Sequence, residues 1–339
     1  MMTLQNYVQV MRPAIEDALR QFVMGSLPAD YPELRQMLSY HMGWEGEGAG
    51  PEAQGKRIRP MLVLLCAEAA GGSWRQALPA AVAVELLHNF SLIHDDIQDN
   101  SPLRRNRPTV WVKWGMAQAI NAGDVMFTLA FLAVQDLAKF RPPQDVLRAS
   151  QILQQTCLRL TEGQYLDISY EAQQVLPLEA YWPMIGGKTS ALLSCCSELG
   201  ALAAGITAEE RLAYFREYGY SLGLAFQVLD DWLGIWGDST QTGKSVESDL
   251  SSGKKTLPVL YALSKNGAFA RRWLAGKITP EEVPSVVKLL EAEGADSFTL
   301  ETAGRLTERS LEALRQAVPS GNAFQAIEEL THALLRRSN

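Results

Sequence analysis

Apolar positions recur at helical intervals along most of the chain. The stretch 3–23 carries one apolar stripe, whereas 61–70 and 77–99 are apolar around most of their circumference. A stripe predicts an amphipathic helix at the surface, and an all-round apolar segment predicts a buried one. Further helical patterns cover 115–140, 145–171, 178–204, 207–236 and 256–264, and shorter amphipathic helices are expected over 280–337. No sustained period-two alternation is present, so the pattern predicts an all-α protein.

Three interruptions divide these patterns. Gly and Pro are dense in 42–56, and an Arg-Pro-Pro break lies at 141–143, so both should lie outside helices. The stretch 237–255 is polar and Gly-rich and contains Lys244, Lys254 and Lys255. Such a loop could close over a polyphosphate.

Composition restricts the class of ligand. The 339 residues carry a net charge of -7 and a sequence pI near 5.3. This charge excludes a general basic surface for nucleic acid, so local basic clusters need a smaller anionic partner. The length allows one large domain or two smaller ones.

Cysteine usage and hydropathy indicate a soluble protein of a reducing compartment. The four cysteines, at 66, 157, 195 and 196, lack CxxC spacing and lie in apolar runs, which favours buried thiols. Acidic residues occur early in the N-terminal segment, which argues against a signal peptide. No run reaches the roughly 18 apolar residues of a spanning helix, so we expect a cytoplasmic protein without stable membrane insertion.

Two apolar helices end in carboxylates. Asp95, Asp96 and Asp99 close the segment 77–99, and Asp95 and Asp99 share a helix face at i and i+4. On a second apolar helix, 207–236, Gln227, Asp230 and Asp231 lie on one face at i, i+3 and i+4. One such end is more often solvated surface, but two favour a site that holds Mg²⁺ ions, because magnesium prefers oxygen ligands and often bridges protein to polyphosphate.

Basic residues accompany the first acidic run. Arg104, Arg105 and Arg107 follow it within a few residues, and Lys56 and Arg59 precede an apolar helix. Arginine forks match phosphate oxygens in geometry and charge. Carboxylates that hold a cation, next to arginines, predict a diphosphate ligand.

Further polar residues interrupt apolar helices. His88 lies seven residues before Asp95 on the same face, although an isolated histidine there is more often structural. Gln164 lies three residues before Asp167, also on one face. Lys188 follows two glycines in an apolar helix, which is costly unless an anion pairs with it. A P-loop is rejected because the GxxxxGK spacing and a flanking strand are missing.

The motifs GKRIRP, HNFSLIHDDIQD, LRRNRP, GGKTS, FQVLDD and TGKSVESDLSSGKKT occur in this order between Lys56 and Pro258. Together they resemble the trans-isoprenyl diphosphate synthase family of polyprenyl synthetases. The resemblance implies a single-domain helical bundle, 1–339, around a deep central cavity (the isoprenoid synthase fold). It also implies a homodimer that uses Mg²⁺ to join isopentenyl diphosphate to an allylic diphosphate.

The resemblance assigns roles by position. The residues that would hold Mg²⁺ on the allylic diphosphate are Asp95, Asp96, Asp99, Asp230 and Asp231. Those that would grip the same diphosphate are Arg104, Lys188 and Lys244. The pocket for isopentenyl diphosphate would comprise Lys56, Arg59, His88 and Arg105. Oxygens near the developing carbocation would come from Thr189, Gln227 and Gln164.

The sequence departs from the family pattern in its second acidic motif. That motif often reads DDxxD, but here Gly234 takes the last acidic position, with Asp238 one turn beyond, which leaves one metal ligand in doubt. Phe90, five residues before the first motif, would block long products and favour geranylgeranyl diphosphate, with farnesyl and longer products open. A class I terpene cyclase and a non-catalytic subunit of a heteromeric synthase are the competing interpretations.

Overall fold

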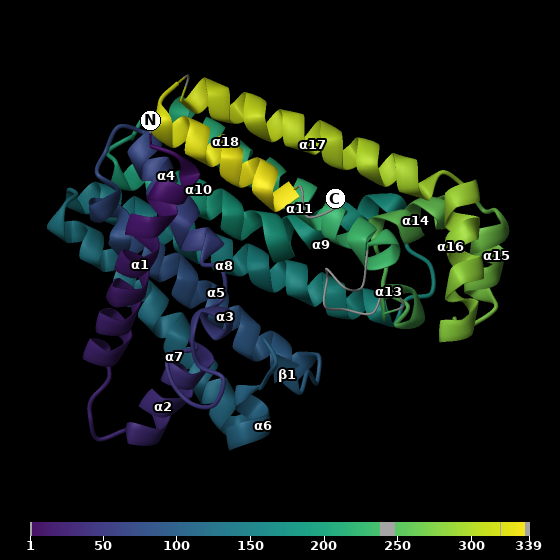
Figure 1. Ribbon diagram of the computed structural model, residues 1–339, viewed down its shortest axis with the longest axis horizontal. Helices are drawn as coiled ribbons and strands as arrows, with labels where there is room; N and C mark the ends of the chain where they lie inside the picture. The colour runs from purple at the N-terminus through teal and green to yellow at the C-terminus, as the bar shows by residue number, and fades with distance from the viewer. Residues whose placement is uncertain (1, 238–247, 319, 336–339) are drawn as a thin grey trace. The chain divides into compact units, whose positions relative to one another are not determined.

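The computed structural model describes residues 2–237, 248–318 and 320–335. Helices account for 79% of the chain, which confirms the all-α class (Figure 1). The α-helices are α1 (Leu4–Ser26), α2 (Pro32–His41), α3 (Pro51–Gln54), α4 (Ile58–Ala69), α5 (Leu78–Gln98), α6 (Val110–Trp114), α7 (Met116–Gln135), α8 (Pro143–Glu171), α9 (Tyr181–Ile185), α10 (Ala191–Ala203), α11 (Glu209–Trp236), α13 (Ser248–Ser251), α14 (Leu257–Ser264), α15 (Ala268–Leu274), α16 (Val283–Ala292), α17 (Ala295–Ala317) and α18 (Asn322–Leu335). Shorter helical turns are η1 (Trp74–Ala77), η2 (Asp136–Lys139), η3 (Leu178–Ala180), η5 (Pro280–Glu282) and the π-helical η4 (Gly186–Ser190).

The chain forms two compact units. Unit 1 comprises Met1–Gln155, Cys195–Phe215 and Ala317–Ile327, and unit 2 comprises Thr156–Ser194, Arg216–Gln316 and Glu328–Asn339. The predicted ligands of the first acidic motif belong to unit 1, and those of the second belong to unit 2. A single domain over 1–339 stays a prediction.

Helix α5 is the central helix of unit 1. Every residue from Ala80 to Leu87 is buried, as expected for a helix that is apolar on all sides. The helix packs against α1, α4 and α7. The one charged residue in this stretch, Glu85, is 3% exposed and pairs with Arg57. The acidic run at the end of α5 is thus carried by a helix that the core of unit 1 fixes in place.

A short hairpin follows α5 and interrupts the helical pattern. Strands β1 (Leu103–Arg104) and β2 (Arg107–Pro108) pair antiparallel, with Leu103 opposite Pro108. Arg105 and Asn106 form the two-residue turn, both with positive φ (52° and 60°). This is the backbone that a tight type I′ hairpin turn requires. The sequence pattern gave no sign of strands here because two residues are too few to show an alternation.

In unit 2, helix α8 approaches η4 closely. A Cβ atom at Gly187 would lie 2.5 Å from the carbonyl oxygen of Arg159 and 2.8 Å from the backbone of Gly163. Only glycines allow two backbones to come this close. The glycines that weaken the predicted helix 178–204 therefore place Lys188 and Thr189 against α8.

The predicted helices are confirmed with shifted ends and some exceptions. The loop 42–56 contains the short helix α3, and α4 begins at Ile58. Arg59 therefore lies within a helical turn rather than before one. The C-terminal region was expected to form shorter helices, but α17 runs for 23 residues, so that expectation was wrong. Propensity alone does not say whether neighbouring amphipathic turns join into one helix.

The expectation about membrane-spanning length was also wrong. By length and composition, Trp74–Gln98 and Met116–Lys139 could each cross a membrane. However, 61% and 44% of their most apolar windows are buried within the protein, and α5 packs against α7. Core helices of water-soluble proteins have the same composition, because a buried helix and a spanning helix both face apolar surroundings. These helices are weak indications of a membrane protein.

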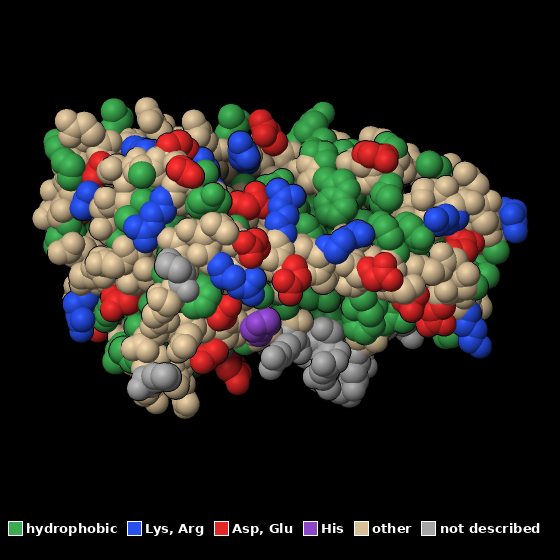
Figure 2. Space-filling view, turned by 90° about the horizontal axis from the view of Figure 1, so that it is seen from above, with side chains coloured by type: hydrophobic (Ala, Val, Ile, Leu, Met, Phe, Trp, Pro, Cys, Tyr) green, Lys and Arg blue, Asp and Glu red, His purple; other side chains and the backbone are tan. Residues whose placement is uncertain are grey.

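The cysteines and surface charge follow expectation. Cys66, Cys195 and Cys196 are buried and Cys157 is half-buried, and none of the four forms a disulfide. Burial raises the pKa of the Cys66 thiol to about 12. Lys and Arg side chains lie interspersed with Asp and Glu over the face shown in Figure 2. Mixed signs of charge offer no extended basic surface there for nucleic acid.

Candidate active site

In unit 1, Arg59 and His88 lie in contact. Arg59 Nη1 is 3.2 Å from His88 Nε2. The pKa of His88 lies well below its usual value because the ring is buried and because Arg59, Arg105 and other arginines surround it. His88 is thus neutral at pH 7 and can accept from Arg59 through Nε2. This contact joins two predicted ligands of isopentenyl diphosphate.

The hairpin turn brings Arg105 to the same region. Its Nη1 donates to the carbonyl oxygen of Ala53 at 2.7 Å, and its guanidinium lies against Gly55. Burial and the neighbouring Arg57 lower the pKa of Arg105 from its usual value. Several positive charges therefore share a partly buried region, which is the arrangement expected of a receptor for a multiply charged anion. Lys56 precedes this group in an exposed position.

The first acidic run divides into an anchored and a more exposed part. Asp96 is 2% exposed, and both its oxygens accept from Arg104 Nε at 2.8 and 2.9 Å. Asp95 is half-buried, and Asp99 is exposed at the residue that ends α5. Of this run, Asp95 and Asp99 present the more accessible oxygens, and Arg104 connects the run to the hairpin.

Arg107, which the sequence grouped with the phosphate-binding arginines, has a structural role. It donates to the carbonyl oxygens of Tyr40, Glu45 and Glu47 at 2.7 to 2.9 Å and lies over the Tyr40 ring. It thereby fixes the loop before α3. Sequence spacing could not distinguish Arg107 from Arg104 and Arg105, because the register of the hairpin decides which arginine side chain reaches the loop.

In unit 2, Asp231 lies at the centre of a hydrogen-bond network. It is 3% exposed and accepts from the Tyr181 hydroxyl at 2.6 Å, from the Leu257 backbone N–H at 3.0 Å and from Gln227 at 3.0 Å. Burial raises its pKa to about 6, although Lys254 and these donors act in the opposite direction. Asp230, one residue earlier, is exposed. The second acidic pair therefore repeats the division into an exposed and an anchored carboxylate.

Lys254 lies near this pair and was not among the predicted ligands. Burial would lower its pKa, but the carboxylates of Asp231, Asp249 and others outweigh burial and raise it. The motif GKKT contained the signal, yet spacing alone did not show which of its lysines approaches the aspartates. Lys244, predicted to grip the diphosphate, and Asp238 lie outside the described residues.

Gly234, the position where the second motif lacks a carboxylate, lies next to a carboxylate from another helix. A Cβ atom built at Gly234 would overlap the Asp249 carboxylate, whose Cγ would be 3.1 Å away. Asp249 belongs to α13 and is half-buried. Its carboxyl group thus lies where the side chain of residue 234 would begin. The doubt raised by the DDWLG sequence concerns one position, and the Asp249 carboxylate lies beside that position.

Lys188 and Thr189 project from the π-helical turn η4. The Lys188 ammonium forms an ion pair with Asp167 of α8. The Thr189 hydroxyl donates to Gln227 Oε1 at 2.9 Å. Gln227 in turn donates to Asp231, so a chain of hydrogen bonds links three predicted site residues. A π-helical turn often marks a functional site, because the inserted residue redirects its side chains.

The last two predicted site residues are Gln164 on α8 and Phe90 on α5. Gln164 is half-buried on α8, one turn before Asp167. Phe90 is half-buried on α5, and its ring lies 5.0 Å from that of Phe127, which lies 4.8 Å from Phe131. Phe90 is thus the first member of an aromatic row between α5 and α7.

The donor chemistry of the acidic runs fits Mg²⁺. Asp95, Asp99 and Asp230 offer carboxylate oxygens with some exposure, and magnesium takes one or two carboxylates together with water and phosphate. Among the residues that the structure describes, no three His, Cys, Asp or Glu side chains form a closed metal-binding group. An incomplete ligand set of this kind is suited to a metal that arrives with a polyphosphate.

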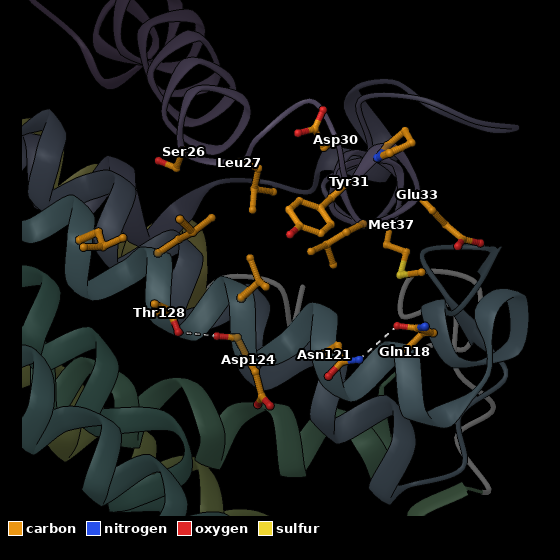
Figure 3. A pocket seen from close by; sticks show the side chains of 15 residues that line it. Ser26, Leu27, Asp30, Tyr31, Glu33, Met37, Gln118, Asn121, Asp124 and Thr128 are labelled. Atoms are coloured by element: carbon orange, nitrogen blue, oxygen red, sulfur yellow. Dashed lines mark hydrogen bonds between the residues drawn. The ribbon is translucent and has the colours of Figure 1, made fainter.

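A separate hollow of about 820 Å³ lies between the α1–α2 connection and α7. Figure 3 shows Leu27 and Tyr31 on one side and the polar residues Gln118 and Asn121 on the other. Its described lining contains acidic residues such as Asp30 but no Lys, Arg or His. The hollow therefore lacks the charge needed to bind a diphosphate, and it includes none of the predicted site residues.

Comparisons with known proteins agree with these features. The family model described as "Polyprenyl synthetase" matches residues 50–290. The chain is 39% identical to a (2E,6E)-farnesyl diphosphate synthase of Mycobacterium tuberculosis over 90% of this chain and 87% of the relative. It is 38% identical to a geranylgeranyl diphosphate synthase of the same organism over 85% of this chain and 83% of the relative.

Solved structures give the same result. A polyprenyl synthetase from Streptomyces coelicolor superposes with a TM-score of 0.82 at 36% identity, covering 98% of both chains. A geranylgeranyl pyrophosphate synthetase from Pyrococcus horikoshii superposes with a TM-score of 0.86 at 32% identity, covering 97% of this chain and 98% of the other. On these matches, the chain belongs to the polyprenyl synthetase family and is a prenyltransferase of the trans-prenyl diphosphate synthase type.

Proposed function

We propose that this protein joins isopentenyl diphosphate to an allylic diphosphate (dimethylallyl, geranyl or farnesyl diphosphate) and releases geranylgeranyl diphosphate as its main product. The observation that carries the proposal is the cluster in unit 1, where Arg59 contacts His88 at 3.2 Å and the hairpin adds Arg105. Such a cluster binds a diphosphate through charge-assisted hydrogen bonds. A family member needs this second anion pocket only if two diphosphates meet in one reaction.

The reaction begins when the allylic C–O bond breaks and the diphosphate leaves with the bonding electrons. Arg104 and Lys188 would stabilise the negative charge that develops on the leaving group. The double bond of isopentenyl diphosphate then attacks the allylic cation, and a proton is lost from the adjacent carbon to the departed diphosphate. The Thr189 and Gln227 oxygens, 2.9 Å apart, would face the positive charge.

Mg²⁺, when bound, would neutralise the charge of the allylic diphosphate and assist its departure. Asp95, Asp99 and Asp230 would supply its protein ligands, whereas Asp96 and Asp231 are hydrogen-bonded to the side chains of Arg104 and Tyr181. Asp249 would replace the carboxylate that Gly234 lacks, because it lies at that position. Lys254 would add positive charge beside this group.

Phe90 supports a product of limited length. Its ring is the first of a row with Phe127 and Phe131, and a row of aromatic rings is difficult to displace. We therefore propose geranylgeranyl diphosphate as the product. Relatives of nearly equal identity carry the names farnesyl and geranylgeranyl diphosphate synthase, so similarity by itself does not favour either.

A homodimer in the cytoplasm is part of the proposal. Met116 and Ile120, one turn apart on α7, are 51% and 41% exposed, which is high for large apolar side chains. A second copy that packs on α7 would bury them. Light scattering of the purified protein should give the mass of a dimer, and Ile120→Glu should shift it toward the monomer. A monomeric wild-type protein would contradict this part.

The deciding experiment incubates purified protein with isopentenyl diphosphate, Mg²⁺ and each allylic diphosphate in turn. Product chain length is then measured by chromatography after phosphate removal. A geranylgeranyl product is expected, and Phe90→Ala should shift the products toward longer chains. A longer wild-type product would keep the enzyme and refute Phe90 as the limit.

The two competing functions give different results in the same experiment. A non-catalytic subunit would condense no substrate although it is folded, and Asp95→Ala would leave its role unchanged. A terpene cyclase would convert an allylic diphosphate without isopentenyl diphosphate. The cations of unit 1 argue against the cyclase, because a cyclase has no second diphosphate to bind.

A further inference from the structure

A buried ion pair lies directly beneath the cationic cluster of unit 1. The side chain of Arg57 has no exposed surface, and its Nη1 lies 2.6 Å from Glu85 Oε1. Its Nε lies 2.6 Å from Glu16 Oε1, and it also donates to the carbonyl oxygen of Met42. None of these contacts leaves Arg57 available to a ligand, although its neighbours in sequence are predicted ligands.

The backbone of Arg57 is held in an unusual conformation. Its φ of 50° and ψ of 38° are left-handed, at the residue that caps α4. Residues with a side chain rarely adopt this conformation, and it persists only where surrounding contacts enforce it. The contacts of Arg57 with Glu85 and Glu16 supply that enforcement, because they fix the side chain on the core side.

The left-handed residue decides where the adjacent cations lie. Lys56, before it, is exposed, whereas Arg59, in the first turn of α4, reaches His88. Glu85 and His88 are one turn apart on α5, so one face of this helix anchors Arg57 and contacts Arg59. The spacing between the two cations thus depends on the ion pair beneath them.

The preceding loop is fixed from its other side. Arg105 donates to the carbonyl oxygen of Ala53 at 2.7 Å, and Arg12 donates to that of Gly55 at 3.1 Å. A Cβ at Gly55 would lie 2.8 Å from Arg105 Cζ, so a larger residue there would displace the guanidinium. The segment from Ala53 to Arg57 is therefore held at both ends.

The ion pair also neutralises the positive charge of Arg57. Burial would lower the pKa of Arg57, but Glu85 and Glu16 outweigh burial and raise it above its usual value. The positive charge of Arg57 is therefore balanced by buried carboxylates. The pKa values of Arg59 and Arg105 are instead lowered, because burial outweighs the attraction of Glu85.

We propose that Arg57, held by Glu85, is a positioning residue that sets Lys56 and Arg59 at the spacing required to bind isopentenyl diphosphate. This inference rests on the proposed function. A buried ion pair is weak evidence for a role in stability, because well-packed apolar residues often replace such a pair without loss. Apolar residues in place of the ion pair should therefore remove the positioning of the two cations without a large loss of stability.

The test makes the double replacement Arg57→Met with Glu85→Leu in a Glu16→Gln background, because Glu16 also pairs with Arg57, and measures isopentenyl diphosphate binding by calorimetry without Mg²⁺ against Glu16→Gln alone. Steady-state kinetics with Mg²⁺ then give KM for each substrate and kcat. We expect the dissociation constant and KM of isopentenyl diphosphate to rise about 10- to 100-fold, as for a misplaced binding group, with KM of the allylic substrate unchanged. A folded double variant with wild-type affinity would overturn the proposal.

Two further variants complete the design. Glu85→Gln keeps the shape of the side chain and removes its charge, and it provides the test if the double variant fails to fold. It should raise KM for isopentenyl diphosphate. An unchanged KM would overturn the proposal. Arg141→Met breaks another ion pair of unit 1, 2.6 Å from Asp145, and should lower the melting temperature without altering KM. Wild-type protein that neither binds nor condenses isopentenyl diphosphate would refute the proposed function itself.

Discussion

The two acidic pairs of this protein look alike in sequence and are built differently. In unit 1, Asp96 is anchored by the charged Arg104, whereas in unit 2 Asp231 is anchored by a tyrosine hydroxyl, an amide and a backbone N–H. In both pairs the second aspartate is buried and the first is more exposed. We therefore expect the first aspartate of each pair to bind the ligand and the second to hold the scaffold.

The largest expected effect is the loss of turnover when the first aspartate of either pair is replaced. Asp95→Asn and Asp230→Asn should each lower kcat about 10²- to 10³-fold, because each removes an oxygen that is predicted to bind Mg²⁺. Melting temperature in the absence of Mg²⁺ should change little, because Asp230 is exposed and Asp95 is only half-buried. Turnover close to that of the wild type in either variant would break the comparison.

The anchoring aspartates should instead control stability. Asp231→Asn should reduce the free energy of unfolding by about 1–3 kcal/mol, because its amide would meet the donors Tyr181 and Leu257 N–H. Asp96→Asn should cost less, because Arg104 is 30% exposed and can be solvated instead. Urea unfolding without Mg²⁺ measures both. A larger loss for Asp96→Asn would reverse the assignment of a charged anchor and a neutral one.

The sequence predicted the helical class and most helix positions because apolar spacing is a local property. It also selected Arg59, His88, Thr189 and Gln227, which the structure joins in pairs. It could not assign Arg107 to the loop or Lys254 to the aspartates, because hairpin register and loop course depend on distant contacts. Nor could it place Asp249 at Gly234, since spacing along one helix contains no information about another.

Acid sensitivity should be concentrated in unit 1. Burial, Arg105, Arg104 and Arg57 lower the pKa of His41 to about 3. Because the unfolded chain binds a proton near pH 6.5 and the folded one does not, stability is complete above pH 6.5 and falls as pH decreases toward 3. The contribution at pH 5 is at most about 2 kcal/mol.

His41→Gln removes this difference. The decrease in unfolding free energy between pH 7.5 and pH 5 should therefore be smaller in the variant than in the wild type, as measured by urea unfolding at both pH values. His94→Gln serves as a control, because His94 lies against Ile120 and Asp124 at the edge of the same unit. An equal effect of both substitutions would mean that the arginine cluster is not the cause.

The smallest expected effect concerns the third acidic position, where the two motifs differ in sequence. Unit 1 has Asp99, and unit 2 has Gly234 with the Asp249 carboxylate beside it. Gly234→Ala should displace Asp249 and weaken the apparent Mg²⁺ affinity about 10-fold, as the loss of a supporting ligand does. Mn²⁺ binding in the presence of inorganic diphosphate, followed by electron paramagnetic resonance, measures the effect without turnover.

A double-mutant cycle identifies the cause of that loss. If Asp249 replaces the missing side chain, Asp249→Ala and Gly234→Ala should each weaken binding, and their combination should weaken it no further. Gly234→Asp should restore affinity in the Asp249→Ala background but lower it in the wild type, where two carboxylates would compete for one position. Additive losses would show that the two residues act separately. The second motif would then bind Mg²⁺ through Asp230 alone, and the two units would differ in ligand number as well as in anchoring.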